Sequence, residues 1–138
     1  MKKIILIITL GFVFSFLGCT KQSIKNRALF LSVEKFDNEA QVAGKENFVD
    51  AEQQNVFSEF IKVNTRIDVS EVELQNENEA TARLTVETFP KSLYSTLKTI
   101  SGKEWKEKVK AAKERKTYLL KMKKTNGDWE IIEQKEIP

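Results

Sequence analysis

Residues 118–131 alternate between apolar and polar side chains on both sides of an Asn-Gly pair, and this pattern restricts the fold most strongly. The apolar members of the pattern are Tyr118, Leu120, Met122, Trp129 and Ile131. Alternation with a period of two is typical of a strand with one buried face. The Asn126-Gly127 pair favours a two-residue turn, because both central positions of a type I′ turn need a positive φ. The sequence therefore predicts a C-terminal β-hairpin with Trp129 in the core.

Two further strand patterns lie upstream of this hairpin. Residues 80–87 alternate cleanly between apolar and polar side chains. Residues 67–69 also alternate, but the apolar positions resume on the opposite parity over residues 72–74. A β-bulge at Ser70–Glu71 restores a single buried face, because a bulge adds one unpaired residue to a strand. We therefore expect a strand pair ahead of the closing hairpin.

The residues before the strands have helical periodicity. We expect a first helix that starts at Ile24, is capped by Ser23 and ends by Gly44. Its apolar residues at helical spacing are Leu29, Phe30, Val33, Phe36 and Ala40. We expect a second helix that is capped by Asn47 and packs on the sheet through an apolar stripe. The stripe comprises Val56, Phe57, Phe60 and Ile61.

Residues 92–115, between the two pairs of strands, predict a helical insertion. Pro90 ends the preceding strand, and Ser92 is suited to cap a short helix. Ser101, with Glu104 three residues later, forms a capping-box pattern for a second helical stretch. The other sides of this stretch are rich in lysine. Its apolar face, which we expect to be buried, comprises Trp105, Val109 and Ala112.

Two N-terminal helices, a strand pair and a closing hairpin together resemble the NTF2-like, or cystatin-like, superfamily. The pattern covers residues 24–138, and its near-literal motif is Gly127-Asp128-Trp129-Glu130-Ile131. The resemblance implies an α+β domain in which N-terminal helices pack on a curved antiparallel sheet and leave a conical pocket. Members use this pocket for catalysis or for binding a ligand or partner. The lysine-rich insertion departs from the family pattern, and it either covers the pocket mouth or changes its use.

The first nineteen residues are organised like a signal peptide. Lys2 and Lys3 form a positively charged start, and an apolar run from Ile4 to Leu17 follows. As a helix this run reaches roughly 21 Å at about 1.5 Å per residue, short of a hydrocarbon core of about 30 Å. We therefore expect a cleaved targeting segment rather than a transmembrane anchor.

The apolar run ends in Phe16-Leu17-Gly18-Cys19, which resembles the lipobox of bacterial lipoproteins. In that family a dedicated peptidase cuts before the cysteine, and the cysteine thiol carries diacylglycerol. The resemblance implies a signal peptide at residues 1–18, a lipidated N-terminus with a short tether at 19–23, and a domain at 24–138. The next residue is not the aspartate of the usual inner-membrane retention signal. We expect a cell-envelope protein held by lipid on Cys19, at the outer membrane if the cell has one.

The residue types in the chain exclude several kinds of chemistry. It contains no histidine and one cysteine, which excludes histidine-based acid–base catalysis, Cys/His nucleophile pairs and an internal disulfide. No metal-ligand spacing, phosphate-binding loop, dinucleotide fingerprint or nucleophile elbow is present. Asp68, Glu71 and Glu73 are expected on exposed strand faces. Tyr94 and Tyr118 are expected to bury their rings in the core. We therefore predict no enzyme activity, no catalytic or metal-binding residue and no cofactor.

Charge is divided between the two halves of the chain. Residues 34–87 carry 13 acidic and 5 basic side chains, whereas residues 91–124 carry 12 basic and 3 acidic ones. Part of the basic excess falls on successive turns of the predicted insertion, at Lys103, Lys106, Lys110, Lys113 and Lys116. One interpretation is a solvated helix face; another is contact with an anionic lipid surface, an envelope polysaccharide or an acidic partner. Loss of Lys2 and Lys3 lowers the formal net charge from +3 to +1, so nucleic acid is not expected as a partner.

Three hypotheses for the function follow. The leading one is a membrane-anchored envelope lipoprotein whose non-enzymatic domain binds a partner protein or an envelope component. The second is a small-ligand binder that uses an NTF2-like pocket, and the third is a degenerate enzyme. An occupied deep pocket would favour the second, whereas capture of one stoichiometric envelope protein would favour the first.

Overall fold

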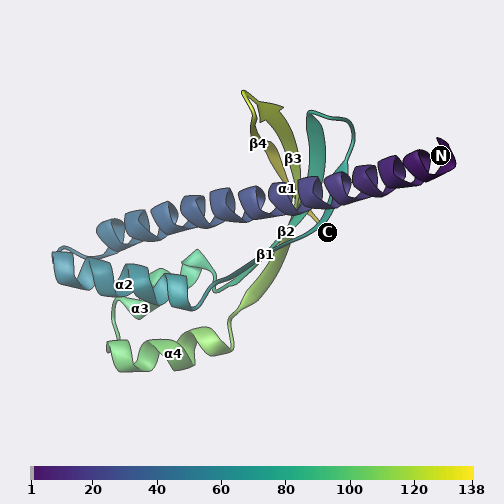
Figure 1. Cartoon of the computed structure of the whole chain (residues 1–138). Coiled ribbons are helices and arrows are strands. Elements are labelled where there is room, and N and C mark those ends of the chain that lie inside the picture. The colour runs from purple at the N-terminus through teal and green to yellow at the C-terminus, as the bar shows by residue number, and fades with distance from the viewer. Residues whose placement is uncertain (1) are drawn as a thin grey trace.

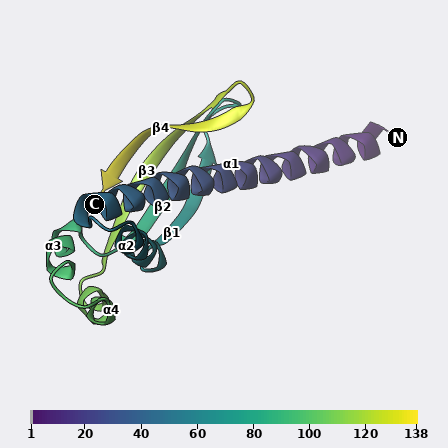
Figure 2. The same cartoon turned by 90° about the vertical axis from the view of Figure 1, so that its left-hand side faces the viewer.

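A long helix lies across one face of a curved antiparallel sheet, and shorter helices gather beyond one end of that sheet (Figure 1, and from the side in Figure 2). The computed structural model describes the backbone of residues 2–138 and the side chains of residues 20–138. The elements in chain order are α1 (Lys2–Asn47), α2 (Ala51–Val63), β1 (Arg66–Leu74), β2 (Glu79–Thr88), η1 (Lys91–Leu93), α3 (Tyr94–Leu97), α4 (Gly102–Lys110), β3 (Glu114–Thr125) and β4 (Asp128–Ile137). The predicted fold class is confirmed: an α+β domain with a helical insertion between strands.

The strands form one antiparallel sheet in the order β1-β2-β3-β4. The register of β1 against β2 shifts between Ser70 and Glu73, and Glu71 has a positive φ of 50° at this point. At the β3–β4 turn, Asn126 and Gly127 have φ values of 54° and 86°, as a type I′ turn requires. The predicted bulge and the predicted hairpin turn are both confirmed.

A second bulge, which the sequence pattern does not indicate, lies in the C-terminal hairpin. The register shifts after the Met122–Ile131 pair and leaves Ile132 outside the ladder, with its side chain 59% exposed. Because a bulge reverses the parity of a strand, Gln134 lies opposite Leu120. The face of β4 that meets α1 is therefore apolar up to Ile131 and polar beyond the bulge.

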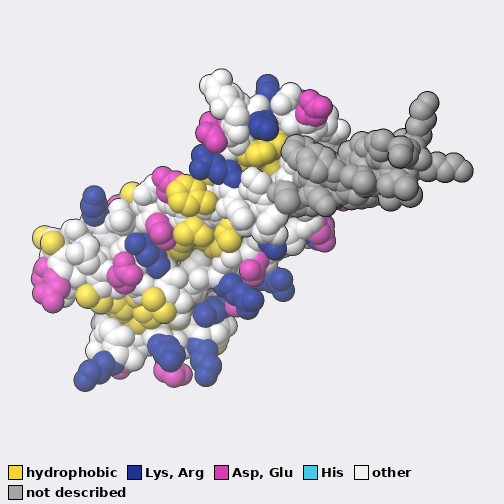
Figure 3. Space-filling model, viewed as in Figure 1, with side chains coloured by type: hydrophobic (Ala, Val, Ile, Leu, Met, Phe, Trp, Pro, Cys, Tyr) yellow, Lys and Arg dark blue, Asp and Glu magenta, His cyan; other side chains and the backbone are white. Residues whose placement is uncertain are grey.

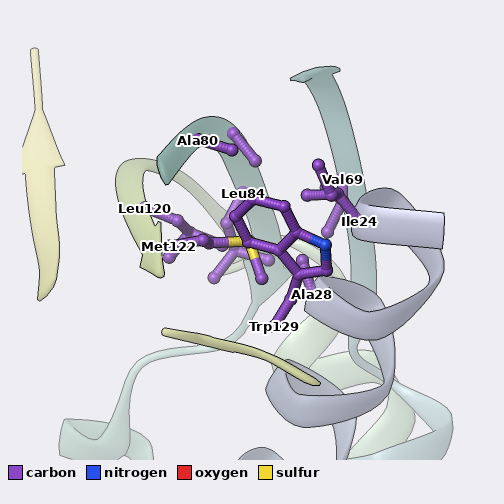
Figure 4. Close-up of a cluster of buried hydrophobic side chains, with 9 residues drawn as sticks. Ile24, Ala28, Val69, Ala80, Leu84, Leu120, Met122 and Trp129 are labelled. Carbon is purple, nitrogen blue, oxygen red and sulfur yellow. The ribbon is translucent and has the colours of Figure 1, made fainter. Parts of the chain in front are cut away.

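The first of two cores lies between α1 and the sheet. Trp129 is 6% exposed and lies beside Ala28 and Met122 (Figure 4), so its predicted place in the core is confirmed. The Arg27 Nε atom donates a hydrogen bond to the Trp129 carbonyl oxygen at 3.2 Å, which ties α1 to the hairpin. The other buried members are Ile24, Val69, Ala80, Ala82, Leu84 and Leu120.

The first helix differs from its prediction in its ends and in its buried face. The helix already includes Ser23, which therefore caps nothing, and it ends at Asn47 instead of Gly44. Phe30 and Val33 are exposed rather than buried. Besides Ile24, small residues make up the buried face, namely Ala28, Ser32, Ala40 and Ala43. Close approach of a helix backbone to a neighbouring element favours small side chains at the contact. The bulkier Phe30 and Val33 therefore point outward.

The second core is formed by the helices together with Phe89. Phe57 and Ile61 of α2 are buried as predicted, but Val56 is 54% exposed. The prediction that α2 packs on the sheet is wrong, because α2 packs against α1 and, through aromatic rings, against Trp105 of α4. The other buried members are Ala40, Ala43, Leu97 and Val109.

The insertion also begins and ends differently from its prediction. Ser92 lies inside η1 and provides no cap, whereas Ser101 caps α4 as predicted by accepting a hydrogen bond from the Lys103 amide at 3.4 Å. Helix α4 ends at Lys110, earlier than predicted, and β3 begins at Glu114. The reason is that the β2–β3 ladder extends further toward the insertion than the apolar alternation indicates.

The turn between α1 and α2 brings the two helix backbones close together. Asp50, not Asn47, caps α2 by accepting a hydrogen bond from the Glu52 amide at 2.9 Å. The Asn47 side-chain amide donates instead to the Ala43 carbonyl oxygen at 2.7 Å. A Cβ atom at Gly44 would lie 2.5 Å from the backbone oxygen of Gln54, so the position has no room for a side chain.

We expect Gly44→Ala to destabilise the domain despite the better helix propensity of alanine. Overpacking against a backbone typically costs about 1–3 kcal/mol, whereas the propensity gain is about 1 kcal/mol. The measurement is the urea midpoint of unfolding. Gly102→Ala is the matched control, because no atom lies within 4 Å of a Cβ there, and its midpoint should be unchanged or higher. A Gly44→Ala midpoint at or above that of the unaltered domain would contradict the close approach.

Candidate functional site

A cleft lies between α1 and the concave face of the sheet, next to the first core. Its volume is about 470 Å³, within the range of about 300–1,000 Å³ that is typical of small-molecule sites. Side chains from α1, from all four strands and from the segment after β2 line it. The apolar part of the lining comprises Phe36, Ile67, Leu84, Val86, Phe89 and Pro90. These walls suit an apolar ligand body.

Ser32 places a polar group in this lining. The residue is 7% exposed, and its Oγ atom is buried with no hydrogen-bond partner among residues 20–138. An unsatisfied buried hydroxyl typically costs about 1–3 kcal/mol, because it has lost its bonds to water. The Oγ atom is closed to the cleft as well as unpartnered, so a ligand could bond to it only after the neighbouring side chains shift. The sequence did not indicate Ser32 as a site residue, although Ser32 shares a helix face with Ala28 and Phe36.

The charged residues in the lining are three lysines and two glutamates: Lys35, Lys91, Lys116, Glu39 and Glu114. None takes part in an ion pair among residues 20–138. The ion pairs in this range lie elsewhere and join Lys62 to Glu59, Arg66 to Asp68, Arg83 to Glu71 and Lys121 to Glu133. The cleft therefore has an excess of one positive charge, and its lysines are available to an anion.

A second hollow adjoins the cleft and shares Lys35, Glu39 and Lys91 with it. Its volume is about 700 Å³, and Tyr94 from α3 lies in its wall. The Tyr94 ring packs at 5.3 Å from Phe57. Burial raises the pKa of the Tyr94 phenol above its ordinary value, and the Glu39 carboxylate raises that pKa further. The phenol is therefore protonated at neutral pH and can donate a hydrogen bond.

The structure separates the lysines that the sequence placed on one helix flank. Lys103, Lys106 and Lys110 lie exposed on α4, but Lys113 lies in the turn after the helix. Lys116 lies on β3 and lines the cleft. The predicted single row of five lysines is therefore wrong, because α4 ends before the last two.

The other candidate residues fall into two groups. Asp68 is exposed and pairs with Arg66 at 3.2 Å, as expected for a solvated strand face. Glu71 is exposed as predicted and pairs with Arg83 at 3.1 Å. Tyr118, in contrast, lines the cleft beside the first core. The sequence therefore predicted correctly that Tyr118 faces the core. It did not indicate the cleft that Tyr118 lines.

A separate surface feature lies on the helical end of the molecule. Val56 and Val63 of α2 are 54% and 81% exposed, and Phe60 lies between them on the same face. Figure 3 shows a band of hydrophobic side chains between α2 and α4, with lysine and arginine side chains over α4 next to it. This face combines apolar and basic groups outside the cleft.

Among residues 20–138, no three His, Cys, Asp or Glu side chains gather closely enough to hold a metal ion. No helix within the same range is long and apolar enough to cross a bilayer. The side chain of Cys19, the predicted lipidation site, lies outside the described side chains.

Comparisons with known proteins give little further guidance. No family model and no curated protein matches the chain. One similar solved structure is a chain from Xanthomonas campestris described as a calcium/calmodulin dependent protein kinase II association domain. The identity is 18%, the TM-score is 0.33, and the match covers 64% of this chain and 56% of that one. A likeness this loose carries no argument, so the fold class rests on the elements and sheet order described above.

Proposed function

We propose that this chain is a lipid-anchored cell-envelope protein whose domain binds a small amphipathic anion in the cleft, without catalysing a reaction. The observation that carries the ligand class is the lining of the cleft. It combines apolar walls with lysines that form no ion pair among the described residues. The anchor rests on the lipobox-like residues 16–19.

The apolar walls and the charged side chains of the cleft contribute different amounts to the free energy of ligand binding. Each 100 Å² of apolar ligand surface that is buried contributes about 2.5 kcal/mol. A solvent-accessible ion pair contributes only about 0–1 kcal/mol. Most of the affinity therefore comes from the apolar walls, and Lys116 with its neighbours orients the anionic end. A non-catalytic role is consistent with a lining that contains neither histidine nor cysteine.

The test compares a cleft lysine with a lysine outside the cleft. Medium-chain alkyl carboxylates should bind the domain in calorimetric titrations, and the matching alcohols should bind more weakly. Lys116→Glu should lower the carboxylate affinity about tenfold, or about 1.4 kcal/mol, because it replaces attraction by repulsion. Lys106→Glu carries the same charge change on α4 and should leave the affinity unaltered.

Three outcomes would count against the proposed binding of an anion in the cleft. If carboxylates and alcohols bind equally, charge plays no part in recognition. If Lys106→Glu weakens binding as much as Lys116→Glu does, the effect comes from net charge and not from this site. Binding of none of the carboxylates would reject the proposed ligand class.

A second candidate function is favoured by two features of the helical end, namely the exposed Val56 and Val63 of α2 and the lysines of α4. Exposed apolar side chains next to basic ones suit a partner protein with an apolar, acidic surface. Capture of one stoichiometric protein from envelope extracts, with no effect of cleft ligands on the capture, would favour this function.

A further inference from the structure

The start of the expected mature chain lies beside both hairpin turns. Thr20, the residue after Cys19, lines one surface hollow together with residues 74–78 of the β1–β2 turn. Lys124, Asn126 and Gly127 of the β3–β4 turn line the same hollow. In both views the two turns lie at one end of the molecule, and α2, α3 and α4 lie at the other (Figure 1, Figure 2). A lipid on Cys19 would therefore hold this end next to the bilayer.

Backbone hydrogen bonds hold the two turns together as one surface. The Lys124 amide donates to the Asn78 carbonyl oxygen at 2.8 Å, which links the β3–β4 hairpin to the β1–β2 turn. The Gln75 amide donates to the Glu79 carbonyl oxygen at 2.9 Å. The Asn78 amide donates to the Asn76 side-chain oxygen at 2.8 Å. The turns are therefore suited to act as a fixed platform.

The chemistry of this platform suits lipid head groups rather than the hydrocarbon core. Its side chains are exposed and rich in amides, at Gln75, Asn76, Asn78 and Asn126. None of the large exposed apolar side chains of residues 20–138 lies in either turn. Positive charges at Lys21 and Lys124 are accompanied by negative charges at Glu77 and Asp128. The contact is therefore one of hydrogen bonds, with little dependence on salt.

Helix α1 leads from the platform toward the helical end of the molecule (Figure 1, Figure 2). The helix runs without a break through residues 20–23, where the sequence predicted a separate tether. From Thr20 to Asn47 it is about 40 Å long at about 1.5 Å per residue. Charges interact over a Debye length of about 8 Å at physiological ionic strength. Because α4 lies at the other end of the molecule from the turns, we expect its lysines to interact little with a membrane on which the turns rest (Figure 1, Figure 2).

We infer that the two hairpin turns, residues 75–78 and 126–127, are the surface that rests on the head groups of the anchoring membrane. The α2–α4 end then projects away from that membrane, and its lysines face the surroundings. The inference rests on the lipid anchor of the proposed function, but not on the ligand of the cleft.

The test uses the acylated full chain in phospholipid vesicles that contain a quencher on a fraction of the head groups. Because the single cysteine of the chain is acylated, a fluorophore attaches only to an introduced cysteine. Glu77→Cys places it in the β1–β2 turn, and Lys106→Cys places it on α4 as the matched control. The label at 77 should be quenched at low and at high salt. The label at 106 should be no dimmer than in vesicles without quencher.

The possible results separate the orientation from the anchor. If the chain floats with the vesicles but the label at 106 is quenched as strongly as the label at 77, or more strongly, the proposed orientation is wrong and the anchor still holds. Quenching at 77 that disappears at high salt would overturn the hydrogen-bonded platform. If the wild-type chain carries no acyl group and stays in solution, the proposed anchor is wrong, and so is the orientation that depends on it.

Discussion

Trp105→Ala is expected to lower the stability of the domain by about 3–5 kcal/mol, the usual cost of truncating a buried tryptophan. The Trp105 ring is 7% exposed and lies 5.4 Å from Phe57 and 5.2 Å from Phe60. Its Nε1 atom donates a hydrogen bond to the Leu97 carbonyl oxygen at 2.8 Å. The substitution therefore leaves a cavity and a buried carbonyl group that loses this partner.

This loss is large relative to the stability of a small domain, which is about 5–15 kcal/mol. Trp105 joins α4 to α2 and to the end of α3, so its removal weakens the packing of the whole insertion. The C-terminal hairpin belongs to the other core and keeps its own contacts. We therefore expect amide exchange to rise first in the insertion and α2, and only later in the sheet.

Urea unfolding of Trp105→Ala and Trp105→Phe separates the contribution of ring packing from that of the hydrogen bond to the Leu97 carbonyl oxygen. Phenylalanine keeps most of the ring contacts but cannot donate to Leu97, so its loss should be smaller, about 1–3 kcal/mol. An exposed neighbour provides the control, since Lys106→Ala should leave the urea midpoint within about 0.5 kcal/mol of wild type. A Trp105→Ala midpoint equal to that of wild type would show that this core does not stabilise the fold.

The features that the sequence predicted correctly are those with short-range causes. The Asn126-Gly127 turn needs positive φ values, and the two residues supply them without help from distant contacts. The bulge at Glu71 follows from a parity change within one strand. The Ser101 cap depends on an amide two residues later. Each signal lies within a few residues of the structure that it predicts.

The wrong predictions involve choices that distant contacts decide. The buried face of α1 is set by how closely the sheet and α2 approach, so Ala28 and Ala40 are buried while Phe30 is exposed. The packing of α2 depends on the insertion, which arrives more than thirty residues later in the chain. The bulge that exposes Ile132 depends on pairing with β3. Helical periodicity and alternation do not contain this information.

Some of the residues that line the cleft could have been predicted from the sequence. Lys116 shares the parity of Tyr118 and Leu120, so an extension of the strand pattern by two residues would have placed it on the concave face. The lysine-rich composition favoured a helix there instead. Ser32 has a weaker signal, because a serine four residues after Ala28 suits a buried or an exposed helix face equally well. Its unpartnered hydroxyl became evident only from the packing.

Cys19→Ser is expected to abolish acylation and to leave an uncut precursor. Each buried acyl methylene contributes about 0.8 kcal/mol, and two or more chains give stable anchoring where one gives only reversible binding. The serine hydroxyl does not replace the thiol as the acyl acceptor in the lipoprotein pathway that the sequence resembles. The proposed head-group contact of the turns is too weak to hold the domain alone, because it buries no large apolar side chain.

Metabolic labelling with a fatty acid, fractionation and intact mass together measure this outcome. The wild-type chain should carry label, begin at Cys19 and fractionate with the envelope, whereas Cys19→Ser should lack label and retain residues 1–18. Thr20→Ser is the matched control, because it introduces the same residue type one position later and keeps the cysteine. It should be labelled and cut like wild type. A wild-type mass that shows an unmodified Cys19, or cleavage at another position, would reject the anchor, because the membrane attachment proposed for this protein requires acyl chains on that residue.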